Sequence, residues 1–277
     1  MVAENVDEKV VAGFGDEWSR FDQSDLSRAE LQQMFDNYFN IFPWETLPEH
    51  AIGFDLGCGS GRWARLVAPR VGELHLIDAS AEALAVAQRN LSGTLNCRFH
   101  CANVENIPLA DESCDFGYSL GVLHHVPDTQ GGLCKCIAKL KKGAPFLLYL
   151  YYRFDNRPWW FRLLWKISDL ARQVVSRLPN SLRYSLSQLL AATLYWPLAR
   201  TSLLIEKMGF KVDSLPLSQY RYRSFYVMRN DALDRFGTRL ERRFTKVEIR
   251  EMMENTGLKD ISFSETSFWT AVGVKRE

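Results

Sequence analysis

Three alternating glycines, Gly57, Gly59 and Gly61, lie in the segment FDLGCGSGR. Glycine lets a backbone turn sharply and approach a ligand closely, so this spacing favours a ligand-binding loop. Arg62 stands where the dinucleotide-binding pattern GxGxxG has its third glycine, and the pattern GxxxxGK[ST] of phosphate-binding loops is absent. The spacing therefore disfavours both a nicotinamide dinucleotide and a nucleoside triphosphate as the ligand.

Two acidic residues indicate the charge of that ligand. Asp55 directly precedes the first glycine, where a carboxylate would repel a pyrophosphate but attract an amine or another cation. Asp78 ends the next apolar run, a position from which a carboxylate can accept hydrogen bonds from both ribose hydroxyls. We therefore expect a nucleoside that carries positive rather than phosphate charge.

The segment GVLHHVPD places two histidines, His124 and His125, side by side in a chain that has five. A histidine can serve as a general base, a metal ligand or a packing residue. Adjacent side chains diverge, and no nearby acid completes a ligand set, so the pair does not favour a metal site. At most one of the two is expected to face any given site.

Apolar runs that alternate with helical stretches must position these residues. The pattern predicts strands within residues 51–57, 72–80, 97–103, 114–122 and 144–152. It predicts helices from the glycine loop to Pro69, over 81–91 with Ser80 as the cap, and over 130–143. The pattern also predicts a helix over residues 244–258, with a Thr245–Glu248 capping box. A final pair of strands is predicted over 260–265 and 268–275. Such alternation implies a parallel sheet with helices on both sides.

The same pattern divides the chain into three parts. Residues 1–50 form a helical N-terminal lead-in or cap, and residues 51–152 together with 244–277 form the core. Residues 153–243 break the alternation and contain two expected amphipathic helices, so we interpret them as a helical insertion that covers the acceptor site.

The segments DLGCGSG, LIDAS and NVENIPLADESCDFGYSLGVLHHVPD together resemble the motifs of the class I S-adenosylmethionine (SAM)-dependent methyltransferases of small molecules. The resemblance implies an α/β fold: a Rossmann-like, doubly wound, mostly parallel seven-stranded sheet with a C-terminal antiparallel strand pair and a helical lid insertion. It also implies SAM as the cofactor, S-adenosylhomocysteine (SAH) as the product, and no metal.

The resemblance assigns a place around SAM to individual residues. Asp55 would lie near the amino group of SAM, Asp78 would bind the ribose, and Leu120 would lie near the sulfonium. The methionine part would pack on the glycine loop, at Gly57, Cys58, Gly59 and Gly61. The adenine would lie on the segments that follow the second and third strands, at Ala79, Asn103 and Val104. The family usually has Asp where this chain has Asn103, whose amide oxygen can still accept from the adenine amine.

The catalytic candidate follows from a related resemblance. O-methyltransferases of plant phenolics have a similar stretch, and their catalytic base matches His124 rather than His125. We therefore expect His124 to face the acceptor as a base or as part of the pocket wall, and His125 to be buried against a backbone carbonyl. The expected reaction is methyl transfer to an oxygen nucleophile, such as a saccharide, lipid-linked or secondary-metabolite hydroxyl. The alternatives are S-methylation of a small thiol and a SAM-binding protein without turnover.

The expected insertion carries 17 Lys and Arg against 7 Asp and Glu, although the whole chain has a net charge of only +1. Three interpretations stay open: a lid over an anionic or amphiphilic acceptor, a basic amphipathic surface on anionic lipid, and an ordinary solvated face.

Several aromatic and basic residues are candidates for contacts with the acceptor. Within an extended segment, Tyr220 and Tyr222 would share one face while Arg221 and Arg223 on the other could clamp a carboxylate or phosphate. Tyr151 and Tyr152 follow the fifth expected strand. Phe14 and Trp18, near the N-terminus, are expected to close over SAM.

The remaining features exclude other classes of protein. The charge balance and the lack of a recognition motif disfavour nucleic acid as a partner. The N-terminus lacks the pattern of a secretory signal, and the uncharged stretch between Arg183 and Arg200 is too short to span a bilayer. We therefore expect a cytoplasmic protein with peripheral membrane contact at most. The six cysteines show no CxxC spacing, which favours reduced thiols over a metal site. Nothing in the sequence indicates the oligomeric state.

Overall fold

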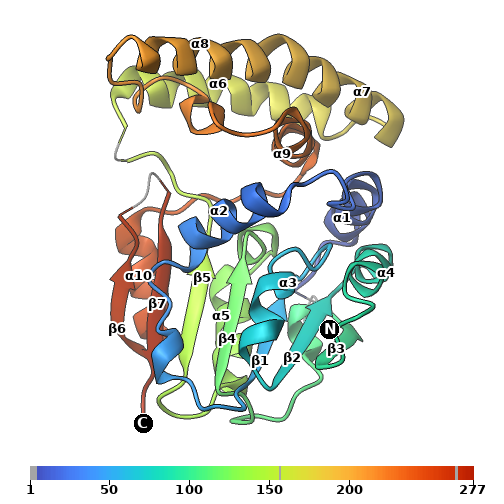
Figure 1. The fold of residues 1–277 in the computed structure, drawn as a ribbon, viewed down its shortest axis with the longest axis vertical. Helices are drawn as coiled ribbons and strands as arrows, with labels where there is room; N and C mark the ends of the chain where they lie inside the picture. Colours follow the sequence, from blue (N-terminus) through green and yellow to red (C-terminus); the bar gives the residue numbers. More distant parts are fainter. Residues whose placement is uncertain (1–4, 156, 266–267) are drawn as a thin grey trace. The chain divides into compact units, whose positions relative to one another are not determined.

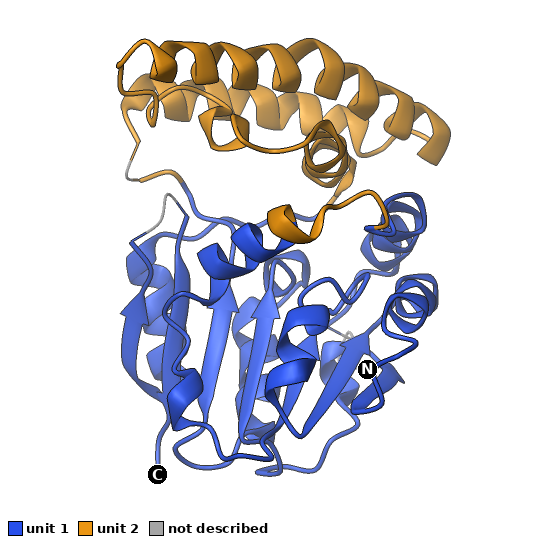
Figure 2. Cartoon of the chain, viewed as in Figure 1, with its two compact units in different colours: residues 1–23, 31–153, 240–277 blue, residues 24–30, 154–239 orange. Residues whose placement is uncertain are grey.

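The computed structural model describes residues 5–155, 157–265 and 268–277, which divide into two compact units (Figure 2). Unit 1 comprises the described residues of 1–23, 31–153 and 240–277, and unit 2 those of 24–30 and 154–239. The predicted boundaries differ from these: residues 24–30 were expected in the lead-in, and residues 153 and 240–243 in the insertion.

Unit 1 is built on a seven-stranded sheet with the strand order β3-β2-β1-β4-β5-β7-β6 (Figure 1). The five strands β1 to β5 pair in parallel, and β7 pairs antiparallel with both β5 and β6. The strands are β1 (Ile52–Leu56), β2 (Glu73–Asp78), β3 (Cys97–Cys101), β4 (Phe116–Leu120), β5 (Pro145–Tyr149), β6 (Leu258–Phe263) and β7 (Thr270–Lys275). This topology confirms the predicted fold class, including the strand pair at the end of the chain.

Burial explains why the central strands are continuous apolar runs. Every residue of β4 is buried, as are the last four residues of β1, because helices cover both faces of the sheet. Aromatic rings dominate this interior, and Phe54, Phe116, Tyr118 and Phe146 are fully buried. The sheet is therefore a rigid platform whose parallel strands bring Asp55, Asp78 and Leu120 to one edge.

Two helices of unit 1 begin after the predicted caps, Ser80 and Thr245, but the helix expected over residues 130–143 ends at Lys139. The helices of this unit are α1 (Glu8–Arg20), α2 (Arg28–Phe39), α3 (Ala64–Val67), α4 (Ala81–Asn90), α5 (Thr129–Lys139) and α10 (Lys246–Asn255), with short 3-10 turns at η1 (Trp44–Thr46), η2 (Ala68–Arg70), η3 (Val104–Asn106) and η4 (Leu123–His125). The first residues of α2 belong to unit 2. Ser80 caps α4 by accepting from the Ala83 amide, and Thr245 and Glu248 form the predicted capping box of α10.

Unit 2 is helical, as the sequence predicted for most of residues 153–243. It contains α6 (Trp159–Val175), α7 (Asn180–Leu190), a π-helical turn η5 (Ala191–Tyr195), α8 (Trp196–Lys207), a 3-10 turn η6 (Ser218–Tyr220) and α9 (Phe225–Gly237). Its core consists of alanines, aromatic residues and one methionine from η5, α8 and α9: Ala191, Tyr195, Ala199, Met228, Ala232 and Phe236. The sequence analysis did not predict α9. Within the described residues, no helix combines the length and apolarity that crossing a bilayer requires.

Candidate functional site

The glycine loop after β1 adopts a backbone conformation that only glycine takes without strain. Gly57, Gly59 and Gly61 have φ values of +75°, +53° and +72°. A Cβ at Gly57 would lie 2.2 Å from Cγ2 of Val122, and one at Gly59 would lie 2.8 Å from the indole of Trp18. Since neither position has room for a side chain, Val122 and Trp18 pack directly against the loop backbone.

Asp78 ties this loop to the end of β2. Its Oδ2 accepts from the Gly59 amide at 2.8 Å, and its Oδ1 accepts from the Ser80 amide at 2.9 Å. Each carboxylate oxygen has a further lone pair, so both can still accept from a vicinal diol. Burial raises the pKa of Asp78, against the lowering effect of these backbone hydrogen bonds.

Asp55 is a buried acid near the end of β1, and its carboxyl has fewer hydrogen bonds than that of Asp78. The residue is 1% exposed, and its Oδ2 has no hydrogen-bond partner among the described residues. Burial raises the pKa of Asp55 to about 8, and the Tyr118 hydroxyl and, more weakly, the Arg62 guanidinium oppose that rise. A cation placed beside this carboxyl would stabilise its ionised form and reverse the effect of burial.

Helix α1 lies along the loop and brings in both aromatic candidates from the N-terminal region. The Trp18 indole covers Gly59, and the Arg62 guanidinium lies 5.4 Å from the Trp18 ring and 4.5 Å from the Trp63 ring. The Phe14 ring lies 5.0 Å from that of His125. Phe14 and Trp18 thus connect the histidine pair with the glycine loop. Arg62 and Trp63 were not candidates from the sequence, because single residues in the turn before α3 carry no motif.

The histidine pair is buried on the 3-10 turn that follows β4. His124 is 0% exposed, and the expectation that it faces an acceptor stays a prediction. Its ring lies 3.9 Å from both the Tyr151 ring and the His125 ring, which together exclude solvent. Neither ring nitrogen of His124 has a hydrogen-bond partner in the described part of the chain. Burial lowers the pKa of His124 well below its usual value, helped by His125 and Arg243, so the imidazole is neutral.

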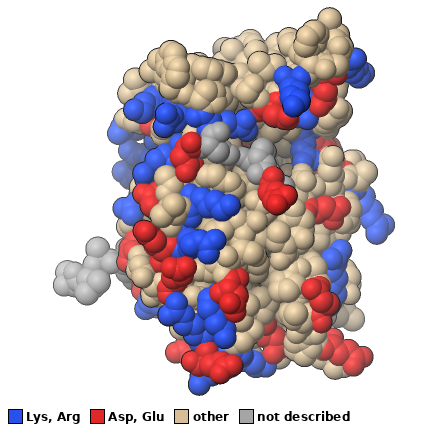
Figure 3. All heavy atoms as spheres, turned by 90° about the vertical axis from the view of Figure 1, so that its left-hand side faces the viewer, with Lys and Arg blue, Asp and Glu red and all other residues tan. Residues whose placement is uncertain are grey.

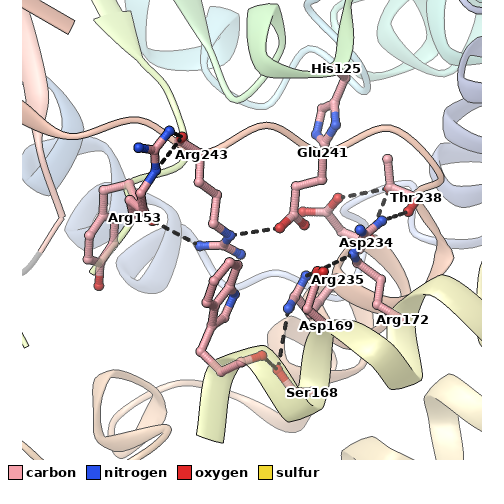
Figure 4. A network of polar contacts seen from close by, with 12 residues as sticks. His125, Arg153, Ser168, Asp169, Arg172, Asp234, Arg235, Thr238, Glu241 and Arg243 are labelled. Carbon is pink, nitrogen blue, oxygen red and sulfur yellow. Dashed lines mark hydrogen bonds and ion pairs between the residues drawn. The ribbon is translucent and has the colours of Figure 1, made fainter. Parts of the chain in front are cut away.

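His125 behaves as predicted for a buried imidazole. Its Nδ1–H donates to the Leu240 carbonyl at 2.7 Å, and the Arg242 amide donates to the His124 carbonyl at 3.0 Å. Residues 240–244 thereby form a strip beside the turn and the end of β5. Figure 4 shows Arg243 of this strip reaching Glu241, a bond of 2.7 Å between two side chains that are 10% and 1% exposed.

The two tyrosines after β5 diverge. Tyr151 lies on His124, with the Arg243 guanidinium 5.1 Å from its ring. Tyr152 instead packs 5.5 Å from the ring of Trp269, next to β7. Tyr151 is therefore the member of the pair that the structure brings to the histidines. Arg243 and Glu241 were missed by sequence analysis because they lie far from any motif and reach the site only through the fold.

The residues assigned to the adenine lie where the second and third strands end. Asn103 caps η3, with its Oδ1 accepting from the Glu105 amide at 3.0 Å, so one lone pair of this oxygen is already used. Val104 and Leu120 are buried. Cys58 is also buried, and burial raises the pKa of its thiol well above the usual value, which leaves it unreactive. Ala79 follows Asp78 directly, at the end of β2.

The expectation for Tyr220 to Arg223 is wrong in its local structure. This segment is a 3-10 turn followed by further turns in unit 2, so the side chains do not alternate between two faces. Arg221 forms an ion pair of 2.8 Å with Glu206, and the Tyr222 hydroxyl donates to the same carboxylate. The Tyr220 ring packs 5.4 Å from that of Tyr195. Arg221 is therefore already neutralised within unit 2. Contact of Tyr220, Tyr222 and Arg223 with an acceptor stays a prediction.

The chain matches known proteins over the part that carries this site. Residues 54–148 match the methyltransferase domain family. An uncharacterized methyltransferase of Bacillus subtilis is 31% identical over 110 residues, which are 39% of this chain and 43% of that protein. A malonyl-[acyl-carrier protein] O-methyltransferase of a Marinomonas species is 31% identical over 105 residues, 37% of this chain and 38% of that protein. The chain thus matches less than half the length of these curated relatives.

Solved structures share the fold over most of the chain. A SAM-dependent methyltransferase from Thermotoga maritima has a TM-score of 0.51 and 14% identity, and the match covers 95% of this chain and 100% of the other. A SAM-dependent methyltransferase from Methanosarcina mazei has a TM-score of 0.50 and 15% identity, with 84% and 95% covered. At this level of identity the likeness establishes the fold.

Proposed function

We propose that this chain, which carries a class I SAM-dependent methyltransferase domain, transfers the methyl group of SAM to the hydroxyl of a small-molecule acceptor. The observation that carries the proposal is that the two acids beside the glycine loop differ in their hydrogen bonding. Asp78 is bonded to the loop through Gly59, whereas the buried carboxyl of Asp55 has an oxygen without a partner in the described residues. That arrangement suits a ribose next to an ammonium group and would repel a pyrophosphate.

The residues present fit SAM in a further respect. Because Gly57 and Gly59 have no side chains, Val122 and Trp18 can pack directly on the loop, and Trp18 supplies an aromatic face beside it. Stacking of an aromatic face against a sulfonium or an ammonium is favourable through the ring quadrupole. The assignment of Asp78 to the ribose and of Asp55 to the amino group is part of the proposal.

When bound, SAM supplies a methyl group on a positively charged sulfur. The acceptor oxygen forms a bond to the methyl carbon as the carbon–sulfur bond breaks, and SAH is the leaving product. In the proposed mechanism, the chain positions the two reactants in line, and the neutral His124 imidazole takes the hydroxyl proton on a free ring nitrogen. The observations that support this role are the neutral state of His124 and its lack of a hydrogen-bond partner. Tyr151, whose ring centroid lies 3.9 Å from that of the imidazole, would orient the base.

One observation favours S-methylation of a small thiol as a second candidate. Burial makes His124 a weak base, since its pKa lies well below the usual value. A thiol ionises far more readily than an alcohol and needs little help from a base.

The test has two parts. The first compares SAM affinity, by calorimetry, between the wild type, Asp78→Asn and the control Asp111→Asn, whose carboxyl is exposed and paired with Lys139. We expect Asp78→Asn to weaken binding by about tenfold or more, because an amide loses the charge and half of the acceptor capacity of the carboxylate. Equal affinity of the wild type and Asp78→Asn would contradict the assigned ribose contact.

The second part measures SAH release with a panel of alcohols, phenols, saccharides and thiols. Release with hydroxyl acceptors supports the proposal, and release with thiols alone moves the assignment to S-methylation. Tight binding of SAM with no SAH release for any acceptor class would indicate a binding protein without turnover.

A further inference from the structure

Helix α6 turns a continuous apolar face to the solvent. Its exposed large apolar residues recur at helical spacing on one side, and several are among the most exposed in the molecule: Trp159 (70%), Trp160, Leu163, Leu164, Ile167, Leu170 (64%) and Val174 (64%). Isolated exposed leucines are ordinary on a protein surface, but a stripe along the whole helix is not. The pattern indicates a surface that is covered when the protein works.

The opposite side of the same helix carries a buried arginine. Arg172 is 6% exposed, and its guanidinium donates to the Thr238 carbonyl at 2.9 Å and pairs with Asp169 at 2.7 Å (Figure 4). Arg183 of α7 is buried in the same way and donates to the Gly237 carbonyl at 3.2 Å. These arginines satisfy carbonyls at the C-terminal end of α9, where a positive charge is also favourable to the helix dipole. Unit 2 thus buries two guanidinium groups beside its apolar core, while large apolar side chains are exposed on α6.

The neighbouring helices extend the apolar surface. On α7, η5 and α8 the exposed large apolar residues are Leu182, Leu186, Leu189, Leu194, Trp196, Leu198 and Leu204, and Met208 and Phe210 follow the end of α8. Figure 3 shows a large area of uncharged side chains at the top of the view, with charged side chains, many of them Lys and Arg, beside it. We call this set of residues on α6 to α8 the apolar face.

Basic residues accompany the apolar face. Residues 154–239 hold 14 Lys and Arg against 6 Asp and Glu. Arg162 and Lys166 are exposed on α6, and Lys207 and Lys211 are exposed beside Met208 and Phe210. Asp169, the acidic residue of α6, forms ion pairs with Arg172 and Arg235. An apolar stripe with tryptophans and flanking cations is the composition of helices that lie in the interface of anionic membranes.

We propose that the apolar face binds the surface of a lipid bilayer that contains anionic lipids. The leucine and tryptophan side chains of α6 to α8 enter the boundary between headgroups and acyl chains, and the flanking Lys and Arg contact the anionic headgroups. The helices lie on the bilayer rather than cross it, consistent with their length and composition. The inference does not depend on the methyl acceptor, and it holds whether the acceptor is a lipid or a soluble molecule.

The test is flotation of the full-length protein with vesicles of phosphatidylcholine, with and without phosphatidylglycerol. We expect the wild type to float with the anionic vesicles and much less with the neutral ones. The variant Ile167→Glu/Leu170→Glu should lower the partition coefficient by about tenfold or more, because two charged side chains replace apolar ones that would be buried in the bilayer. Leu95→Glu is the matched control, since Leu95 is 89% exposed but lies in unit 1.

Two further measurements test the proposal even if a variant folds poorly. Circular dichroism and SAM affinity establish that the variants are folded. In the wild type alone, anionic vesicles should shift tryptophan fluorescence to shorter wavelength, and brominated lipids should quench it. No flotation of a folded wild type with either vesicle overturns the proposal. A dimer in light scattering that Ile167→Glu/Leu170→Glu dissociates, without vesicle binding, would reassign the apolar face to a second copy of the chain.

Discussion

The Asp78 carboxylate accepts a hydrogen bond from the Gly59 amide at 2.8 Å and thereby joins the ends of two neighbouring strands. Gly59 can take part because its φ of +53° points its N–H toward β2, and because it has no side chain between the loop and Trp18. The loop and the proposed ribose-binding acid therefore act as one unit, in which a change at either residue alters the other.

Replacement of Gly59 by alanine tests this coupling. The added Cβ would lie 2.8 Å from the Trp18 indole and would add the strain of a left-handed backbone, typically about 1–2 kcal/mol. We expect SAM affinity to fall by about tenfold or more, with the fold retained. Calorimetry measures the affinity, and Gly93→Ala is the control because no atom lies within 4 Å of a Cβ at Gly93. Unchanged SAM binding by Gly59→Ala would show that the loop does not approach the ligand.

SAM binding should release a proton from the Asp55 carboxyl. Because the pKa of Asp55 is raised to about 8 in the ligand-free chain, the carboxyl is mostly protonated at pH 7. The ammonium group of SAM favours the ionised form, so binding lowers this pKa and releases up to about one proton at pH 7. SAM affinity should accordingly decrease as the pH falls below 8.

Calorimetry of SAM binding in buffers with different heats of ionisation measures the released proton. Asp55→Asn should abolish the release. Asp111→Asn should leave it unchanged, since the Lys139 ammonium lowers the pKa of that exposed carboxyl and keeps it ionised. Equal proton release by the wild type and Asp55→Asn would exclude the proposed contact with the amino group.

His124→Ala separates chemistry from binding. If the acceptor is a hydroxyl, the loss of the base should lower kcat by about a hundredfold or more while the Kd of SAM stays the same. If the acceptor is a thiol, the loss should be much smaller. His50→Ala, at an exposed position, is the control. Since the pKa of His124 lies well below its usual value, the wild-type kcat should show no titration of this imidazole near pH 6.5.

The capping box of α10 makes a prediction about stability. The Thr245 side chain accepts from the Glu248 amide at 3.2 Å, and the Glu248 carboxylate accepts from the Thr245 amide at 2.7 Å. Thr245→Ala should lower the free energy of unfolding by about 1 kcal/mol. Urea denaturation measures the difference, with Ser92→Ala at an exposed turn as the control. No loss of stability in Thr245→Ala would show that the cap is replaced by solvent.

The sequence by itself determined the sheet, its order of elements and the acids beside the glycine loop. These features depend on local signals: continuous apolar runs for buried strands, glycine spacing for the loop, and Ser80 and Thr245 as helix caps. The predicted helix over residues 81–91 and the final strand pair match α4 and the β6–β7 pair closely. Such signals act over a few residues, so they can be read without the fold.

The tertiary structure alone decided the environment of the side chains. The burial of His124 depends on Tyr151 and on the strip at residues 240–244, which meet it only after the chain has folded. Tyr220 to Arg223 take a turn rather than a strand, because Arg221 and Tyr222 bond to Glu206 on a neighbouring helix. The raised pKa of Asp55 and the buried Arg172 likewise result from contacts between residues far apart in the sequence. Burial and partner choice depend on the whole fold, and a residue's type and spacing do not encode them.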